Sequence, residues 1–389
     1  MSDYPFSRLA ALLKDVAPKP GLAPIDLSIG EPKDGAPEFV RDILASGFEH
    51  YGRYPPVPGT ADLRRAIADW MIARYRLPTG LIDPEVNVAP LSGTREGLFM
   101  LPLVAVPERK AAERPAVLMP NPFYQVYKGG AVAARAEPVF LLADRASGFL
   151  PRLDTVDEGL LARTALVYVC SPSNPQGAVA GRDYLAKAIA LARRHDFVLA
   201  VDECYAEVYD QNPPPGGLEI AAETGSLANV VVFHSLSKRS SAPGLRSGFV
   251  AGCPKVLRAL KGLRNYAAAG TPGPIMAAAT ALWREESHVG AMRARYRARF
   301  EAAERVIGNR FGHYRPAGGF FLWLEVGHGE GATRKLWAES AVRVLPGGYL
   351  GFTGPDGTNP GEAYIRLALV HDASVCEDAA RRIAATLPG

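Results

Sequence analysis

The sequence has little cysteine, no long hydrophobic run and almost no excess of charge. Its four cysteines in 389 residues form no CxxC pair, which fits a reducing cytosol, and we expect no bound metal. No run approaches the ~18 apolar residues of a membrane span, and the first residues lack the pattern of a signal peptide. The net charge of +4 is too small to favour a nucleic acid or a membrane surface. We therefore expect a cytoplasmic protein with neither partner.

The composition that remains is that of a large globular protein. Hydrophobic residues make up 48% and charged residues 22%, and the length allows about two domains. Helix-like patterns cover residues 61–76 and 183–195. Short apolar runs lie at residues 116–119, 165–170, 197–202, 230–233 and 248–252. Such alternation, with strands apolar on both faces, is typical of a mainly parallel sheet covered by helices. We predict an α/β fold with this sheet in a large domain over residues 45–285.

The two ends of the chain predict a smaller α+β domain, assigned to residues 1–44 and 286–389. Residues 5–40 contain the breakers APKPGLAP and SIGEPKDGAP and predict an irregular N-terminal arm. A long helix is predicted over residues 290–308. Its arginines indicate a solvated face rather than a nucleic-acid site, because no basic excess supports them elsewhere. The strand-like runs GGFFLWLEV, VRVLPGGYL and YIRLALV follow.

Polar residues follow several of the predicted strands. Ligands of parallel sheets bind beyond the carboxyl ends of the strands, so these residues are candidates for a site. Asp202 and Tyr205 follow FVLAV, and Asn174 stands in the rigid turn SPSNPQG. A helix cap or a core salt bridge explains Asp202 about as well as a functional role, and an ordinary loop explains Asn174.

Two further segments have the same ambiguity. Gly93 and Thr94 open a helix, where free backbone N–H groups make an anion site, although a plain helix cap is the commoner meaning. Tyr124, after AVLM, is able to stack on a flat ring, although a core aromatic is the simpler explanation.

The stretch HSLSKRSSAPGLRSGF carries the most distinctive chemistry. Ser235, Ser237 and Arg246 are donors for a phosphate, and Lys238 supplies an amine. Near the C-terminus, Arg366 lies inside an apolar strand, where its guanidinium needs a carboxylate and can bind one through two hydrogen bonds.

As a set, these motifs resemble the pyridoxal-phosphate-dependent class I/II aminotransferases of the aspartate aminotransferase fold (fold type I). The family's order is kept through SPSNPQG, DECY, SLSK, GLRSGF and IRLAL, and the resemblance covers residues 26–370. Three stretches are most similar in sequence to the succinyldiaminopimelate transaminases of lysine and diaminopimelate biosynthesis. They are SLSKRSSAPGLRSGFVAG, NPFYQVYKGGA and YPPVPGTADLRRAIADW.

The resemblance implies a role for each candidate residue. Lys238 would be the Schiff-base lysine of pyridoxal 5'-phosphate (PLP), and Asp202 would pair with the pyridine nitrogen. The other cofactor contacts would be Tyr205 and Asn174 on the phenolic oxygen, Tyr124 on the ring, and Gly93, Thr94, Ser235, Ser237 and Arg246 on the phosphate. Arg366, with backbone near Gly30 and with Asn174, would bind the substrate carboxylate. Tyr54 matches a tyrosine that reaches the partner subunit's phosphate, which implies a homodimer with shared active sites.

The implied chemistry is a ping-pong transamination between amino acids and 2-oxo acids, with glutamate and 2-oxoglutarate as the expected pair. PLP takes up the electrons of a Cα carbanion, and a buried carboxylate such as Asp202 keeps the ring nitrogen protonated. Lys238 would move the Cα proton, which requires a depressed lysine pKa. Nearby positive charge such as that of Arg246 would favour this depression.

Departures from the family pattern leave the side-chain pocket open. Gln176 replaces the usual threonine of NPTG, and Arg95, beside Thr94, is either an added cation for the cofactor or directed elsewhere. Lys33, Arg53 and Arg264 are candidate cations for a succinyl or distal carboxylate, although a solvated surface charge is the simpler explanation for each.

Two alternatives share the same residues. Another fold type I enzyme, a lyase or an aminotransferase for alanine, aspartate or aromatic substrates, would keep every residue named above. A PLP-binding regulatory domain is the non-enzyme alternative. Such regulators are fused to a helix-turn-helix domain, and we expect no room for one because the motifs begin by residue 26.

Overall fold

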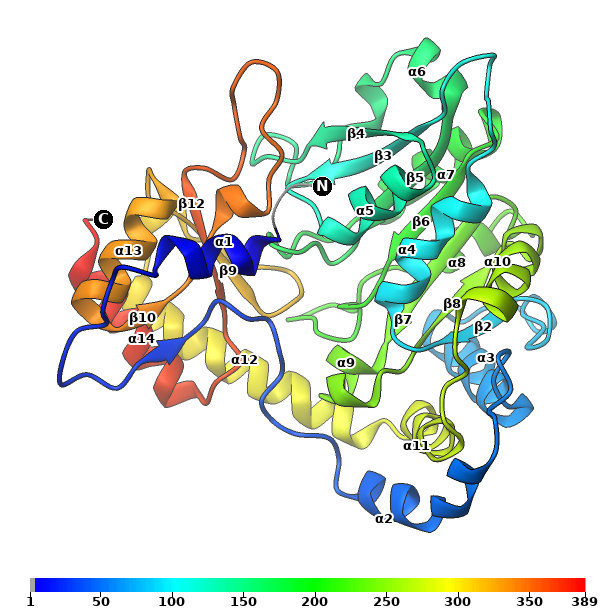
Figure 1. Ribbon diagram of the computed structural model, residues 1–389, viewed down its shortest axis with the longest axis horizontal. Coiled ribbons are helices and arrows are strands. Elements are labelled where there is room, and N and C mark those ends of the chain that lie inside the picture. The colour runs from blue at the N-terminus through cyan, green and yellow to red at the C-terminus, as the bar shows by residue number, and fades with distance from the viewer. Residues whose placement is uncertain (1–3, 389) are drawn as a thin grey trace.

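A seven-stranded sheet forms the centre of the larger part of the molecule. The structure is a computed structural model that describes residues 4–388. The strand order is β2-β8-β7-β6-β5-β3-β4 (Figure 1), and every pair from β7 to β4 is parallel, whereas β8 runs against both neighbours. The strands are β2 (Val88–Leu91), β3 (Ala116–Asn121), β4 (Glu137–Leu142), β5 (Thr164–Cys170), β6 (Val198–Asp202), β7 (Val230–Ser235) and β8 (Gly248–Gly252). The predicted α/β class with a mainly parallel sheet is confirmed.

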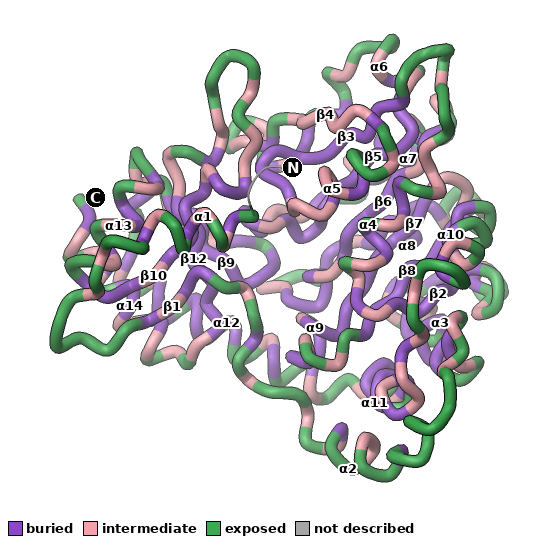
Figure 2. Tube along the Cα trace, viewed as in Figure 1, coloured by how far each residue is buried: buried purple, intermediate pink, exposed green. Residues whose placement is uncertain are grey.

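Helices cover both faces of this sheet, which explains why its inner strands are apolar throughout. One face packs on α4 (Thr94–Ala105), α5 (Gln125–Ala133) and α10 (Pro254–Ala267). The other face packs on α3 (Ala61–Tyr75), α6 (Glu158–Arg163), α7 (Arg182–Arg194), α8 (Gly217–Ala222) and α11 (Gly273–Arg284). The strands β5 and β7 are buried along their whole length (Figure 2).

The rest of the chain builds two small sheets flanked by helices. The order of the three-stranded antiparallel sheet is β11 (Leu345–Pro346), β12 (Tyr364–Ala368) and β9 (Phe321–Glu325). The N-terminal β1 (Ile25–Asp26) pairs in parallel with β10 (Val342–Arg343), far away in the sequence. The neighbouring helices are α12 (Ser287–Ile307), α13 (Gly329–Ser340) and α14 (Ala373–Thr386). The boundaries of the small domain at residues 44 and 286 stay a prediction.

The prediction of an irregular arm over residues 5–40 is wrong in part. Residues Pro5–Leu12 form the helix α1, the short strand β1 follows, and α2 (Phe39–Ser46) begins before residue 40. Pro5 fits the first turn of α1, where its missing N–H group costs nothing. Leu9 is fully buried in a cluster with Trp323 and Leu345, so the helix is stabilised by residues more than 300 positions away.

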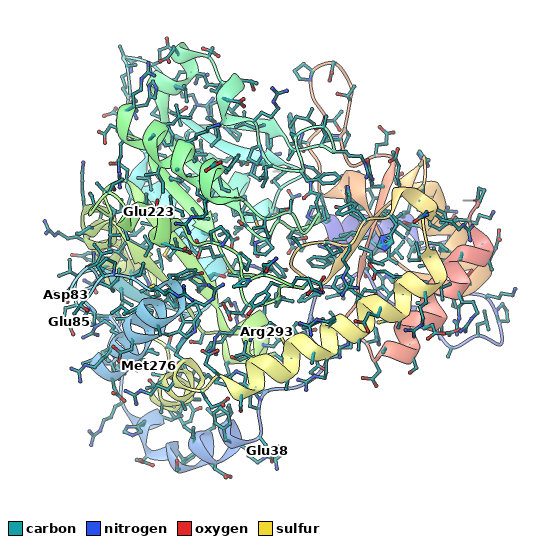
Figure 3. All side chains as sticks on the ribbon, turned by 180° about the vertical axis from the view of Figure 1, so that it is seen from behind. Glu38, Asp83, Glu85, Glu223, Met276 and Arg293 are labelled. Atoms are coloured by element: carbon teal, nitrogen blue, oxygen red, sulfur yellow. The ribbon has the colours of Figure 1, made fainter. Side chains whose placement is uncertain are left out.

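The arginines of α12 form ion pairs with carboxylates; one of these arginines, Arg293, is labelled on the helix in Figure 3. The pairs are Arg293 with Glu207, Arg295 and Arg299 with Asp34, Arg297 with Asp210, and Arg305 with Glu377. Their charge is therefore largely balanced within the chain, which removes the main reason to consider this helix a nucleic-acid surface. No helix within residues 4–388 is both long and apolar enough to cross a membrane.

Candidate active site

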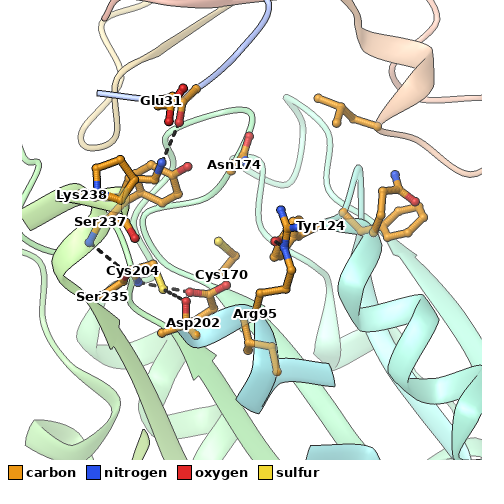
Figure 4. A pocket seen from close by; sticks show the side chains of 18 of the residues that line it. Glu31, Arg95, Tyr124, Cys170, Asn174, Asp202, Cys204, Ser235, Ser237 and Lys238 are labelled. Carbon is orange, nitrogen blue, oxygen red and sulfur yellow. Dashed lines mark hydrogen bonds between the residues drawn. The ribbon is translucent and has the colours of Figure 1, made fainter. Parts of the chain in front are cut away.

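A cavity of about 390 Å³ lies at the carboxyl ends of β5, β6 and β7, and residues of the N-terminal segment (Gly30) and of β12 (Arg366) also line it. Figure 4 shows the cavity with Asp202, Ser235 and Lys238 near the strand ends and Glu31 above them. Most of the residues predicted for the site line this cavity. They are Gly30, Thr94, Arg95, Tyr124, Asn174, Asp202, Tyr205, Ser235, Ser237, Lys238, Arg246 and Arg366. They come from segments separated by more than 300 residues, and the parallel strands bring them together.

Lys238 lies in the short helix α9 (Leu236–Arg239), directly after β7. Ser235 begins this helix, and its hydroxyl accepts a hydrogen bond from the Ser237 N–H at 3.1 Å. The Lys238 amine donates to the carbonyl of Gly30 at 2.6 Å. Burial lowers the pKa of Lys238 to about 8, and the charges of Arg366 and Arg246 act in the same direction. Desolvation is thus the main cause of the depressed pKa, ahead of the positive charge that the sequence led us to expect.

Asp202 ends β6 with its carboxylate enclosed on the cavity side. Its oxygens accept hydrogen bonds from the Tyr127 hydroxyl at 2.6 Å and from the Cys204 N–H at 3.2 Å. Burial raises the pKa of Asp202, and these hydrogen bonds oppose that shift. A cationic partner in the cavity would stabilise this carboxylate in its charged form.

A group of hydrogen-bond donors lies where α4 and β7 approach each other. Gly93 has φ of 86°, and a Cβ at this position would collide with the guanidinium of Arg246. Thr94 begins α4, and its hydroxyl lies 3.1 Å from the sulfur of Cys204. Arg246 donates to the Pro243 carbonyl at 2.9 Å and forms no ion pair with any residue between 4 and 388. Hydroxyls, a guanidinium without an ion pair and a helix start together suit a phosphate.

Arg366 reaches the cavity from β12 on the opposite side. Its guanidinium donates to the Ser28 carbonyl at 2.7 Å and to the Asn174 side chain at 3.1 Å, and lies over the ring of Phe321. Burial lowers the pKa of Arg366 to about 10. Its Nε has no partner within the described residues. A buried guanidinium with a free N–H and no carboxylate is suited to bind an external carboxylate.

The aromatic residues occupy the sides of the cavity. Tyr205 is 8% exposed, and burial raises the pKa of its hydroxyl well above the usual value. The hydroxyl of Tyr124 accepts a hydrogen bond from Arg95 Nε at 2.8 Å. The Arg95 side chain is thus directed to Tyr124, while its backbone lies next to Thr94.

Two predicted residues lie outside the cavity lining. Gly93 is adjacent to it, behind Arg246. Tyr54 is fully exposed and touches no part of the cavity, so its role toward a partner subunit stays a prediction.

The candidate cations for a distal carboxylate lie elsewhere as well. Arg264 is 1% exposed and binds Glu96 at 2.9 Å and the Pro90 carbonyl at 2.7 Å, so it is neither a surface charge nor free for a ligand. Lys33 lies 3.0 Å from the His371 ring at the surface, and Arg53 is exposed.

Several lining residues were missed in the sequence. Tyr127 is the most important, since its hydroxyl binds Asp202; its position three residues after Tyr124 on a helix was the available signal. Cys204, between Asp202 and Tyr205, also lines the cavity, as do Tyr4 and Phe6 at the start of the chain. No sequence pattern pointed to Tyr4 and Phe6 as lining residues, because the N-terminal arm was predicted to be irregular.

The residues present fit PLP. Four features surround one cavity: an enclosed carboxylate, a half-buried lysine of low pKa, a guanidinium packed so closely on Gly93 that a Cβ there would collide with it, and a second guanidinium without a carboxylate partner. These groups match the ring nitrogen, the aldehyde and the phosphate of PLP, and the carboxylate of an amino acid.

Comparison with known proteins agrees with this chemistry. The family model for aminotransferase class I and II matches residues 23–383, so the chain belongs to this PLP-dependent family. A 4-dedimethylamino-4-oxo-anhydrotetracycline transaminase, OxyQ, from Streptomyces rimosus is 32% identical over 95% of both chains. An LL-diaminopimelate aminotransferase from Syntrophobacter fumaroxidans is 29% identical over 98% of this chain and 95% of its own. A solved aminotransferase from Neisseria meningitidis has 36% identity and a TM-score of 0.93, and covers 100% of this chain and 98% of its own.

Proposed function

We propose that this aminotransferase acts on N-succinyl-LL-2,6-diaminopimelate, with 2-oxoglutarate as amino acceptor, in lysine and diaminopimelate biosynthesis. The support for the pathway is the amino-acid sequence around Lys238 and Tyr124, together with relatives named as LL-diaminopimelate aminotransferases. The support for a succinylated substrate is Arg95, a cation that lines the cavity and has no part in the reaction steps described below.

Each group in the cavity has a proposed part in the reaction. PLP, when bound, supplies the electron sink for the Cα carbanion. Lys238 would hold the cofactor and would move a proton at the substrate Cα, for which its low pKa suits it. Asp202 keeps the ring nitrogen protonated. The remaining contacts are Tyr205 and Asn174 on the phenolic oxygen, Tyr124 on the ring, Gly93, Thr94, Ser235, Ser237 and Arg246 on the phosphate, and Arg366 with Gly30 on the substrate carboxylate.

Arg95 is the observation that favours an acidic side chain in the substrate. Its guanidinium lines the cavity, is exposed, donates from Nε to Tyr124 and forms no ion pair within the described residues. It is available to a second carboxylate, which both 2-oxoglutarate and the succinyl group carry. Unsuccinylated diaminopimelate also carries a distal carboxylate, but an ammonium group lies beside it. Its distal end therefore has no net charge and would be attracted to Arg95 less strongly than the distal end of the succinylated compound. We therefore replace the predicted role of Arg95 in binding the cofactor by a role in binding the distal carboxylate.

We further propose that the enzyme works as a cytoplasmic homodimer. Tyr54, which has no contact with its own cavity, would complete the partner's phosphate site, and its full exposure leaves it free to do so. All four cysteines are free thiols, as expected in a reducing compartment.

The substrate is tested by steady-state kinetics of the wild type and of Arg95→Met with succinyl-diaminopimelate, LL-diaminopimelate and alanine as donors. The wild type should prefer the succinylated donor, and Arg95→Met should raise its KM about 10-fold while leaving the KM for alanine unchanged. Arg95→Lys, which keeps the charge, is the matched control. A preference for LL-diaminopimelate, or an equal loss for all donors, would overturn the succinylated substrate and keep the aminotransferase.

A further inference from the structure

A buried polar network lies on the reverse face of the strands that end at the cavity. It consists of Glu203, His234 and Tyr75, and we call it the Glu203 network. One Glu203 oxygen lies 2.8 Å from the Tyr75 hydroxyl and 2.8 Å from His234 Nε2. The other accepts a hydrogen bond from the Gly217 N–H at 2.6 Å. None of these side chains is more than 4% exposed, and none lines the cavity.

Each end of the network is one residue away from a residue proposed to bind PLP. Glu203 follows Asp202, and His234 precedes Ser235. Because successive side chains of an extended strand point to opposite faces, Asp202 and Ser235 face the cavity side of the sheet and Glu203 and His234 the α3 side. The strands are tied at this level, since the Glu203 N–H donates to the Phe233 carbonyl at 2.9 Å.

The network joins four elements at a single carboxylate. Tyr75 ends α3, His234 lies on β7, Gly217 begins α8, and Glu203 continues β6. The surroundings are aromatic, with the Trp70 ring 5.0 Å from that of His234 and 6.1 Å from that of Tyr75. A carboxylate in such a place is costly unless every oxygen is bound, and apolar side chains would fill the same space without that cost. What the polar arrangement provides instead is a defined position for the strand ends.

A second link runs through charge. Burial raises the pKa of Asp202, and among the influences that lower it, after the hydrogen bonds of Cys204 and Tyr127, is an electrostatic contribution from His234. The 2.8 Å contact with Glu203 restrains the orientation of the His234 ring.

We propose that Glu203, His234 and Tyr75 are positioning residues for PLP: they fix the ends of β6 and β7 so that Asp202 and Ser235 meet the cofactor in one geometry. This inference rests on the roles proposed above for Asp202 and Ser235. The network itself touches neither cofactor nor substrate.

The test uses Glu203→Gln and Tyr75→Phe, which keep the shapes of the side chains. Glu207→Gln is the matched control, because Glu207 is 5% exposed, pairs with Arg74 and Arg293, and lies off the strand ends. For each protein we would measure the dissociation constant of PLP, the pH midpoint of the visible absorption of bound PLP, the kcat and KM for glutamate, and the Tm of the apoprotein.

We expect Glu203→Gln to weaken PLP binding by about 10-fold, to shift the absorption midpoint and to lower kcat more than it changes KM. Tyr75→Phe should act in the same direction with a smaller effect. Glu207→Gln should lower only the Tm. If Glu203→Gln does not fold, Tyr75→Phe decides the question.

The inference is overturned if the network variants lower the Tm as Glu207→Gln does but leave PLP binding and absorption at wild-type values. Failure of the proposed site would look different, because the wild type would then bind no PLP or would keep its absorption in Asp202→Asn.

Discussion

Two cations face the same cavity from different regions of the molecule: Lys238 is half-buried and Arg366 is buried, and the loss of solvent has different consequences for each. Lys238 comes from the end of β7, and Arg366 from the antiparallel sheet near the C-terminus. Both donate to carbonyls of the N-terminal segment, Lys238 to Gly30 at 2.6 Å and Arg366 to Ser28 at 2.7 Å. Burial lowers the pKa of both, to about 8 for the lysine and to about 10 for the arginine.

The two pKa values suit the two residues to different tasks: Lys238 to chemical reaction, and Arg366 to binding a carboxylate. Near pH 7 to 8 a sizeable fraction of Lys238 is neutral and can act as a nucleophile or base, whereas Arg366 stays charged and can hold a carboxylate. The β5–β7 side of the cavity is thus proposed to serve the cofactor, and the β12 side the substrate. Variants on the first side should change the properties of bound PLP, and variants on the second should change KM alone.

The largest effect is expected for Lys238→Ala. Without the amine no covalent attachment of PLP and no proton transfer at Cα is possible, and the transamination rate should fall by more than about 1,000-fold. Single-turnover rates with glutamate measure this. Lys110→Ala is the matched control, because Lys110 is partly buried, donates to the Thr164 carbonyl at 2.6 Å, and lies outside the cavity. Activity in Lys238→Ala close to that of the control would contradict the assignment.

Asp202→Asn should have the next largest effect. The amide cannot keep the ring nitrogen protonated, so kcat should fall on the order of 100-fold, and the visible absorption of bound PLP should change. Absorption spectra and kcat measured on the same preparation check both. An unchanged spectrum with a raised KM would mean that Asp202 binds substrate, and would contradict the division of the cavity into a cofactor side and a substrate side.

Arg366→Lys should change substrate binding and leave the cofactor alone. Lysine keeps the charge but not the paired donors, so the KM for glutamate should rise by about 10-fold with the spectrum unchanged. Dissociation constants for a non-reactive dicarboxylate provide an independent measure. A spectral change as large as that of Asp202→Asn would show that the two sides are not separate.

A smaller effect is predicted for pH. The neutral amine is the reactive form, and burial lowers the pKa of Lys238 to about 8, so the rate at which the apoprotein takes up PLP covalently should rise with pH and level off above about 8. Stopped-flow absorbance between pH 6 and 10 measures this rate. A rate still rising steeply at pH 10 would mean that the lysine keeps its ordinary pKa.

The strand-end residues could be found in the sequence because their signal is local. An apolar run followed by Asp202, or by Ser235 and Lys238, identifies both the strand and the polar end, and parallel strands place such ends together. The long helices α3 and α12 were also predictable, since each has an apolar face of its own.

The remaining features depend on distant parts of the chain. The helix α1 forms because Leu9 packs on Trp323 and Leu345, which no local pattern reveals. From the sequence alone, Arg264 is most simply explained as a surface cation, because its partner Glu96 lies 168 residues earlier in the chain. Tyr127 was indistinguishable from a core aromatic until its hydroxyl was placed on Asp202.

The most direct test of the account is the visible absorption of the purified chain with bound PLP, followed while glutamate or succinyl-diaminopimelate is added. We predict that either donor removes the band, that 2-oxoglutarate restores it, and that Lys238→Ala lacks the response. A chain that takes up PLP with no band dependent on Lys238, or a band that no amino acid removes, would contradict the assignment of this cavity as the site of transamination.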